Sequence, residues 1–120
     1  MTLRRMKTYT GAQGYVYQYY FVGQRDALAA DPDAPAAEYI FDVTSDRKTT
    51  YAVSVLVPAA VIKAWEASHQ RKLAAPELYG AVKLRLFQAF DEIEDLLAHG
   101  RRLRLDSAAF ERALSTLGAA

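Results

Sequence analysis

The sequence predicts an α+β fold in which a three-stranded antiparallel meander is packed on one face by a long helix. Apolar residues alternate as in strands over the first half of the chain and recur at helical spacing over the second half. The three strand-like segments follow one another without a helical connection, and parallel strands need such a crossover, so a meander is favoured. The expected order of elements is β-β-β-α-α-β-α.

The predicted strands are the segments 15–22, 38–44 and 50–57, in which aromatic or β-branched residues alternate regularly. Successive side chains of a strand point to opposite faces, so the odd-numbered residues of each segment share one face. Aromatic rings are prominent in this set, and we expect it to form the core beneath the long helix. The predicted core face consists of Tyr15, Tyr17, Tyr19, Phe21, Tyr39, Phe41, Val43, Tyr51, Val53, Val55 and Val57.

Polar segments precede and connect these strands. Residues 1–14 are interpreted as a flexible N-terminal arm that the fold does not need, and residues 15–120 as a single α+β domain. The segment 24–37 is rich in the aspartates and prolines that set turns, and it is predicted to be a long mobile loop. Residues 45–48 form a polar cluster of hairpin length.

Two prolines introduce the helical half of the chain. Pro58 and Pro76 each suit a first helical turn, because the N–H that proline lacks would have no partner there. The spacing of apolar residues predicts a short helix over about 58–70 and the major helix over 76–99. Gly100 is expected to end the major helix as a left-handed cap.

The last elements are short. Residues 101–105 alternate polar with apolar side chains, as expected of a fourth, edge strand that is protected by charge. Asp106 or Ser107 then caps a final helix that ends at Gly118.

Composition limits the classes of function. The chain has no cysteine, so disulfides, thiolate zinc sites and cysteine nucleophiles are excluded. Its formal charge of +1, from 15 basic and 14 acidic residues, gives no overall field that would concentrate a polyanion. The basic N-terminus lacks the apolar run of a secretory signal, and the longest apolar run, 55–62, is shorter than the roughly 20 residues of a membrane span. We therefore expect a soluble, cytoplasmic protein that does not contact a membrane.

The titratable residues form no motif that supports catalysis. Asp91, Glu92, Glu94 and Asp95 lie together, but no second acidic cluster or calcium loop accompanies them, so we expect arginines at 101–104 to pair with them. His69 is interpreted as a hydrogen-bonded residue at a helix boundary, and His99 as a cation near a helix end. No catalytic, cofactor-binding or metal-binding residue is predicted, and a protein that is not an enzyme is favoured.

The even-numbered residues of the strands form a second face that is too apolar to be simply solvated. One interpretation is that the shorter helices or the N-terminal arm cover it. A second is an interaction surface, because exposed apolar patches with polar rims are typical of such sites and twofold homodimers are the commonest assemblies. A third is a ligand groove. On the second interpretation the chain is a small protein-interaction module that forms a homodimer, with contact residues Val16, Tyr20, Val22, Ile40 and Leu56.

Two alternative functions come from other features. Basic residues beside frequent tyrosines suggest weak binding of single-stranded nucleic acid, although no RNA-binding motif supports it. A small-ligand or enzymatic pocket beneath the 24–37 loop is the other alternative, with polar contacts from Arg25, Asp31 and Asp33. The polyanion contacts would be Arg4, Arg5, Arg102 and Arg104.

Overall fold

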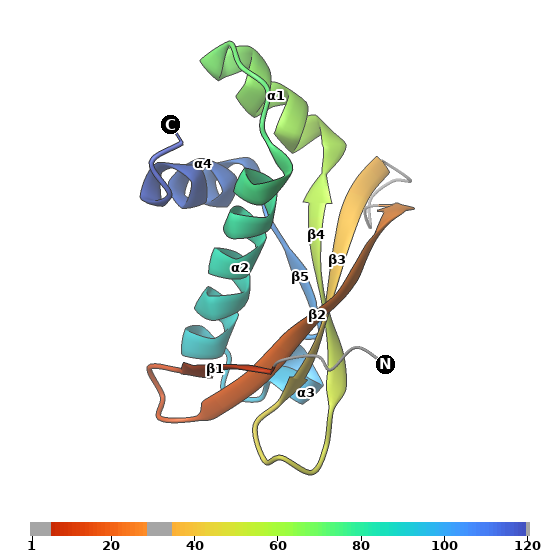
Figure 1. The fold of residues 1–120 in the computed structure, drawn as a ribbon, viewed down its shortest axis with the longest axis vertical. Helices are drawn as coiled ribbons and strands as arrows, with labels where there is room; N and C mark the ends of the chain where they lie inside the picture. Colours follow the sequence, from red (N-terminus) through yellow and green to blue (C-terminus); the bar gives the residue numbers. More distant parts are fainter. Residues whose placement is uncertain (1–5, 29–34, 120) are drawn as a thin grey trace.

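The computed structural model describes residues 6–28 and 35–119 and confirms the predicted α+β class, with a longer sheet than expected (Figure 1). Its five-stranded sheet has the order β1-β2-β3-β4-β5. Neighbouring strands are antiparallel except β4 and β5, which are parallel. The strands are β1 (Lys7–Thr10), β2 (Val16–Leu28), β3 (Pro35–Thr44), β4 (Tyr51–Pro58) and β5 (Arg102–Arg104), the last being the predicted edge strand.

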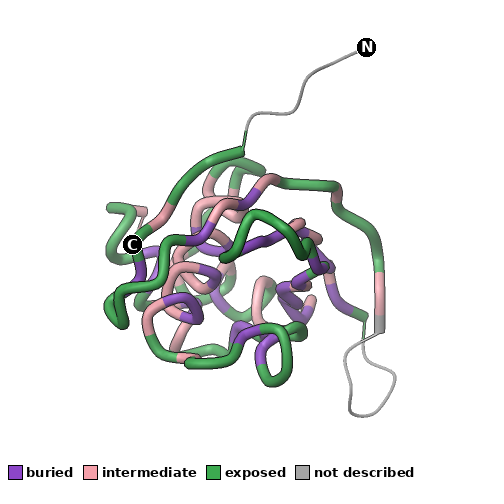
Figure 2. Tube along the Cα trace, turned by 90° about the horizontal axis from the view of Figure 1, so that it is seen from below, coloured by how far each residue is buried: buried purple, intermediate pink, exposed green. Residues whose placement is uncertain are grey.

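The helices pack on one face of the sheet, with α2 and α4 side by side on that face in Figure 1. All four helices contribute buried side chains to a single core that they share with the sheet. Figure 2 shows the buried stretches gathered in the interior and the exposed stretches around them. The helices are α1 (Ala59–His69), α2 (Ala75–Glu92), α3 (Leu96–His99) and α4 (Ser107–Thr116).

The core face of the sheet is the predicted aromatic one. Phe41 and Val53 are completely buried, and the ring of Tyr17 stacks on Phe90 of α2 with 4.2 Å between centroids. Two predicted members lie at the margin of the core instead. Tyr15 precedes β2 and is 47 % exposed, while Phe21, at 37 % exposed, still contacts Phe41 and Tyr79. The rest of the predicted set is buried.

Strands β2 and β3 extend into the segment that was predicted to be a loop. Residues 24–28 and 35–37 continue the β2–β3 ladder, so this prediction was wrong for both ends of the segment, and Asp31 and Asp33 lie outside the described residues. A bulge at Val22 shifts the register, so that Val22 and Gly23 together oppose Ile40. The shift changes which side chains share a face, and Arg25 therefore lies opposite Glu38. The alternation of side chains between the two faces of a strand, with its period of two residues, does not reveal such a bulge.

Strand β1 comes from the segment that was expected to be a flexible arm. Tyr9 stacks on Phe87 of α2, with 4.5 Å between ring centroids and an interplanar angle of 3°. Its hydroxyl donates to the carboxylate of Asp91, 2.9 Å from the nearer oxygen. The same carboxylate accepts the backbone N–H of Ala12 at 2.9 Å. These contacts attach the N-terminal hairpin to the end of α2.

The major helix is shorter than predicted, because the chain leaves it at Ile93 and starts a separate helical turn. The carboxylate of Asp95 accepts the N–H of Ala98 at 3.2 Å and so caps α3. The cap competes with continuation of α2. Gly100 is not left-handed, since its φ is −132°, and the left-handed cap predicted there was wrong. A side chain at this position would instead overlap that of buried Leu96.

Substitution of Tyr9 tests whether β1 belongs to the folded core. We expect Tyr9→Ala to lower the free energy of unfolding by about 2 kcal/mol, because a ring packed on two phenylalanines is lost. Tyr9→Phe should cost about 1 kcal/mol through loss of the hydrogen bond to Asp91. Urea unfolding measures both. Thr8→Ala, on the same strand but exposed, is the control, and equal stability of all three variants would show that β1 is dispensable.

A matched pair of glycines tests the close approach of the N-terminal hairpin to α2. A Cβ at Gly11 would lie 2.6 Å from the backbone oxygen of Phe90, whereas one at Gly23 would meet nothing within 4 Å. We expect Gly11→Ala to destabilise the protein by about 1–3 kcal/mol, because backbone must move. Gly23→Ala should change stability by less than about 0.5 kcal/mol. A thermal unfolding curve for Gly11→Ala that matches wild type would contradict the close approach.

Candidate functional site

The first candidate site is the sheet face opposite the helices, which we call the outer face. Buried residues of the four helices belong to the core on the other side. The buried apolar residues of the outer face form a separate, small cluster of Ala36 and Leu56. Val16 is 47 % exposed and Val22 39 % exposed, and Tyr20 and Ile40 are half-buried beside them. The outer face therefore presents apolar side chains that the described helices leave uncovered.

One predicted contact residue is not at the surface. Leu56 is buried and packs against Ala36 and the partly buried Ala27, so its side chain is not available for contact with a partner. The hydroxyl of Tyr20 donates to Asp42 at 2.7 Å, which orients the ring across β2 and β3. The structure thus brings four of the five predicted residues together at or near the surface.

The far end of the outer face carries charges. Arg25 donates from Nε to Glu38 at 2.6 Å, and Glu38 is only 5 % exposed. The hydrogen bond from Arg25 is the main cause that lowers the pKa of Glu38, and Arg102 also contributes. Arg102 and Arg104 are exposed on β5, whereas Arg4 and Arg5 lie outside the described residues. Nucleic-acid binding through these arginines stays a prediction.

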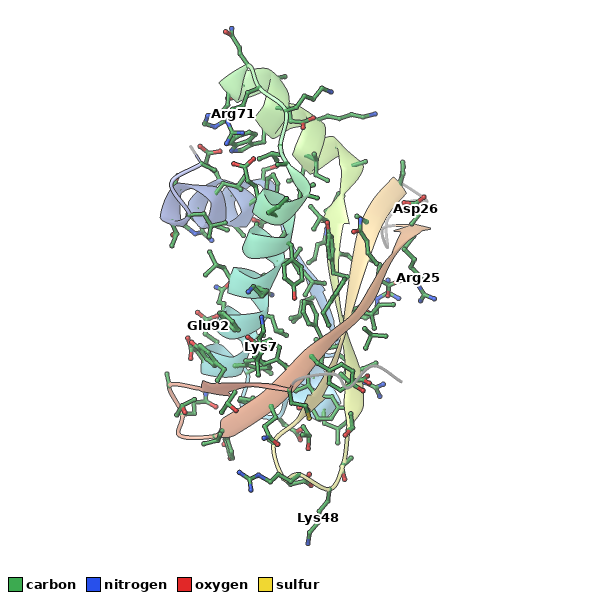
Figure 3. All side chains as sticks on the ribbon, in the orientation of Figure 1. Lys7, Arg25, Asp26, Lys48, Arg71 and Glu92 are labelled. Atoms are coloured by element: carbon green, nitrogen blue, oxygen red, sulfur yellow. The ribbon has the colours of Figure 1, made fainter. Side chains whose placement is uncertain are left out.

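The second candidate site is a cleft of about 680 Å³ at the other end of the sheet. It lies between the start of β2, the β3–β4 turn and the segment that joins α2 to α3. Figure 3 locates this turn by Lys48 at its tip. The apolar part of the lining includes Ile93 and Leu96. Its polar lining includes Tyr15, Tyr17, Tyr51, Asp46, Glu94, Asp95 and His99.

Two tyrosine hydroxyls of the cleft have no hydrogen-bond partner within the described part of the chain. Tyr17 is 2 % exposed and Tyr51 9 % exposed, and both line the cleft. Burial raises the pKa of Tyr51 to about 12, with further contributions from Tyr17, Asp95 and Asp46. Burial is also the main reason that the pKa of Tyr17 is raised. The cleft therefore combines the hydroxyl groups of two buried tyrosines with nearby negative charge.

The sequence pattern does not reveal this cleft, because each of its residues has a simpler interpretation. The tyrosines belong to the alternating core face, and the carboxylates were expected to pair with arginines. Tyr51 is the first residue of β4, and Tyr15 precedes β2, so these rings lie where the core ends. A tyrosine in place of an aliphatic residue at a strand end is the one signal that the sequence contains.

The remaining predicted residues have structural roles. Among the described residues, the arginines at 101–104 form no ion pair with the acidic cluster, and Tyr9 and backbone amides bind Asp91 and Asp95 instead. His69 stacks on Trp65 with 4.2 Å between ring centroids, and its Nε2 lies 3.0 Å from Glu111. The predicted boundary role of His69 is confirmed. No group of three or more potential metal ligands occurs in the described part of the chain.

A smaller cavity of about 460 Å³ lies near the ends of β2 and β3, where a ligand pocket was predicted. Of the three polar residues expected to line it, Arg25 pairs with Glu38 instead, and the two aspartates lie outside the described residues. Asp26 is the one charged residue of its described lining, which is otherwise built from alanine, proline and isoleucine.

Comparison with protein-family models, curated proteins and solved structures gives no match. Over the residues that the structure describes, no helix has the length and apolar character required to span a membrane.

The raised pKa of Tyr51 predicts a loss of stability at alkaline pH. Its folded-state pKa of about 12 exceeds the ordinary value of 10.0, so the fold favours the protonated hydroxyl. The corresponding stability is complete below pH 10.0 and is lost as the pH rises to about 12. We expect Tyr51→Phe to reduce this loss, measured by urea unfolding at several pH values across the window. The same pH dependence in wild type and variant would contradict the assignment.

Proposed function

We propose that this chain is a protein-interaction module that forms a homodimer through its outer face. The observation that carries the proposal is the placement of all described helices in the core on the opposite side, while Val16 and Val22 remain exposed. Burial of such apolar surface is the main favourable contribution to association. Tyr20 lies between these two valines on β2, and Ile40 lies on β3 beside the bulge at Val22, so both extend the apolar contact.

The charges of the outer face favour a second copy of this chain as the partner. The face carries Arg25, Arg102 and Arg104 as well as the acidic Asp42 and Glu38. In a twofold contact each patch meets its own copy in the reverse direction, so a face with both signs can place basic groups opposite acidic ones. A partner surface with a single sign of charge would place like charges opposite either the three arginines or the two carboxylates.

Pairing through the free edge of β2 is less favourable than pairing through the face. Beyond Tyr19, β2 pairs only with β3 among the described residues, so this part of its backbone is a sheet edge. The bulge at Val22 interrupts the edge, and Arg25 and Asp26 occupy its far end (Figure 3). Bulges and charges on an edge strand disfavour addition of another strand.

Sedimentation equilibrium tests the proposed dimer. We expect the wild-type chain to have twice its formula mass at micromolar concentration, and Val22→Asp to raise the dissociation constant at least tenfold, or about 1.4 kcal/mol. The reason is that a charge would be buried in the contact without a partner. Leu117→Asp is the control, because Leu117 is 44 % exposed but belongs to α4's end, away from this face.

The outcome is read only for variants that fold. Circular dichroism should show the same folded spectrum for both variants, since each replaces an exposed side chain. A wild-type monomer at high micromolar concentration, or equal dimerisation of both variants, would remove the support for the outer face as the contact.

A further inference from the structure

The cleft at the end of the sheet carries an excess of negative charge. Three carboxylates line it, those of Asp46, Glu94 and Asp95, and its described lining contains no lysine or arginine. Arg101 is the basic residue that affects Tyr51 electrostatically, but its Nε donates to the backbone oxygen of Ala52 at 3.1 Å. His99 is the one basic side chain of the described lining, so the three carboxylates outnumber it.

The three carboxylates differ in how they are held. Asp46 accepts the N–H groups of Lys48 and Thr49 at 2.8 Å each, which lowers its pKa. Asp95 caps α3 and is held by that hydrogen bond. Glu94 is exposed and has neither a hydrogen bond nor an ion pair within the described ranges. The cleft is thus lined by two carboxylates held by hydrogen bonds, Asp46 and Asp95, and by the unrestrained carboxylate of Glu94.

The hydroxyl groups of two buried tyrosines, Tyr17 and Tyr51, are the second, independent indication of a ligand. Both side chains are more than nine-tenths buried and line the cleft without a partner in the described chain. These hydroxyls form no hydrogen bond with the described residues, so they are available to accept one from a bound donor. A phenolic oxygen accepts such a bond from N–H, and the surrounding carboxylates exclude an anion.

The aromatic and apolar groups select an organic cation over a metal ion. Tyr15 lies at the exposed margin, with its ring centroid 6.4 Å from that of Tyr17, and a tyrosine face attracts a cation. Ile93 and Leu96 provide an apolar surface for an alkyl stem. A volume of about 680 Å³ suits a small organic ligand, whereas a hard metal ion needs several oxygens around one point.

From these features we propose that the cleft binds a linear polyamine. One ammonium group contacts Glu94 and Asp95, and a second lies towards Asp46. The alkyl stem lies over Ile93 and the Tyr15 ring, and the tyrosine hydroxyls accept N–H hydrogen bonds from the ligand. This site is separate from the outer face, so its occupancy does not depend on dimer formation.

Isothermal titration calorimetry of the full chain with spermidine tests this proposal. We expect one bound spermidine per chain. Glu94→Gln should weaken binding about fivefold through loss of one ion pair, and Tyr15→Leu about threefold through loss of the cation–π contact. The matched control is Glu92→Gln, because Glu92 is exposed nearby on α2 but does not line the cleft, and its affinity should equal wild type.

The comparison of the two glutamate variants distinguishes a site from general attraction. Equal weakening by Glu94→Gln and Glu92→Gln would show that spermidine responds only to overall charge and would overturn the proposal. Absence of binding at millimolar spermidine, or displacement of spermidine by an equal concentration of Mg²⁺, would also overturn it. All three substituted residues are exposed, so the variants are expected to fold.

Discussion

The interlocking of aromatic rings between the sheet and α2 is the interaction on which the rest of the structure depends. Tyr17 stacks on Phe90 and Tyr9 on Phe87, so two strands and one helix are joined through rings. Flat rings need close, oriented contact, and such contact leaves no room for other elements between the sheet and the helix. The remaining helices therefore pack around α2 on the same face, with α4 in contact with it.

Both candidate sites follow from this one-sided arrangement. Since every described helix packs on the aromatic face, the outer face keeps its apolar side chains without cover from them. At the end of the sheet the aromatic layer continues to Tyr15 and Tyr51, but α2 has already stopped at Glu92. The cleft is the space that remains between these rings and the chain that turns into α3. Its acidic character comes from the residues that make this turn.

The elements that end α2 also attach the N-terminal hairpin. Asp91 binds Tyr9 and the backbone of Ala12, and Asp95 caps α3. Acidic residues at a helix C-terminus interact unfavourably with the helix dipole, and here hydrogen bonds from other parts of the chain offset that penalty. The sequence pattern of this acidic cluster is typical of a solvated surface. In the structure, two of its carboxylates instead bind the N-terminal hairpin and the start of α3 at the end of α2.

The sequence by itself determined the fold class, the aromatic core face and the edge strand near Arg102, because these depend on local alternation and helical spacing. It also indicated the residues around Val16 and Ile40 as a distinct apolar face. Only the tertiary structure decided that Lys7–Thr10 joins the sheet, that Val22 forms a bulge and that α2 ends before Ile93. The strand and the bulge depend on partners distant in sequence, such as Asp91 for Tyr9, which local patterns do not reveal. The end of α2 involves the nearby Asp95 cap, which the helical spacing of apolar residues does not reveal.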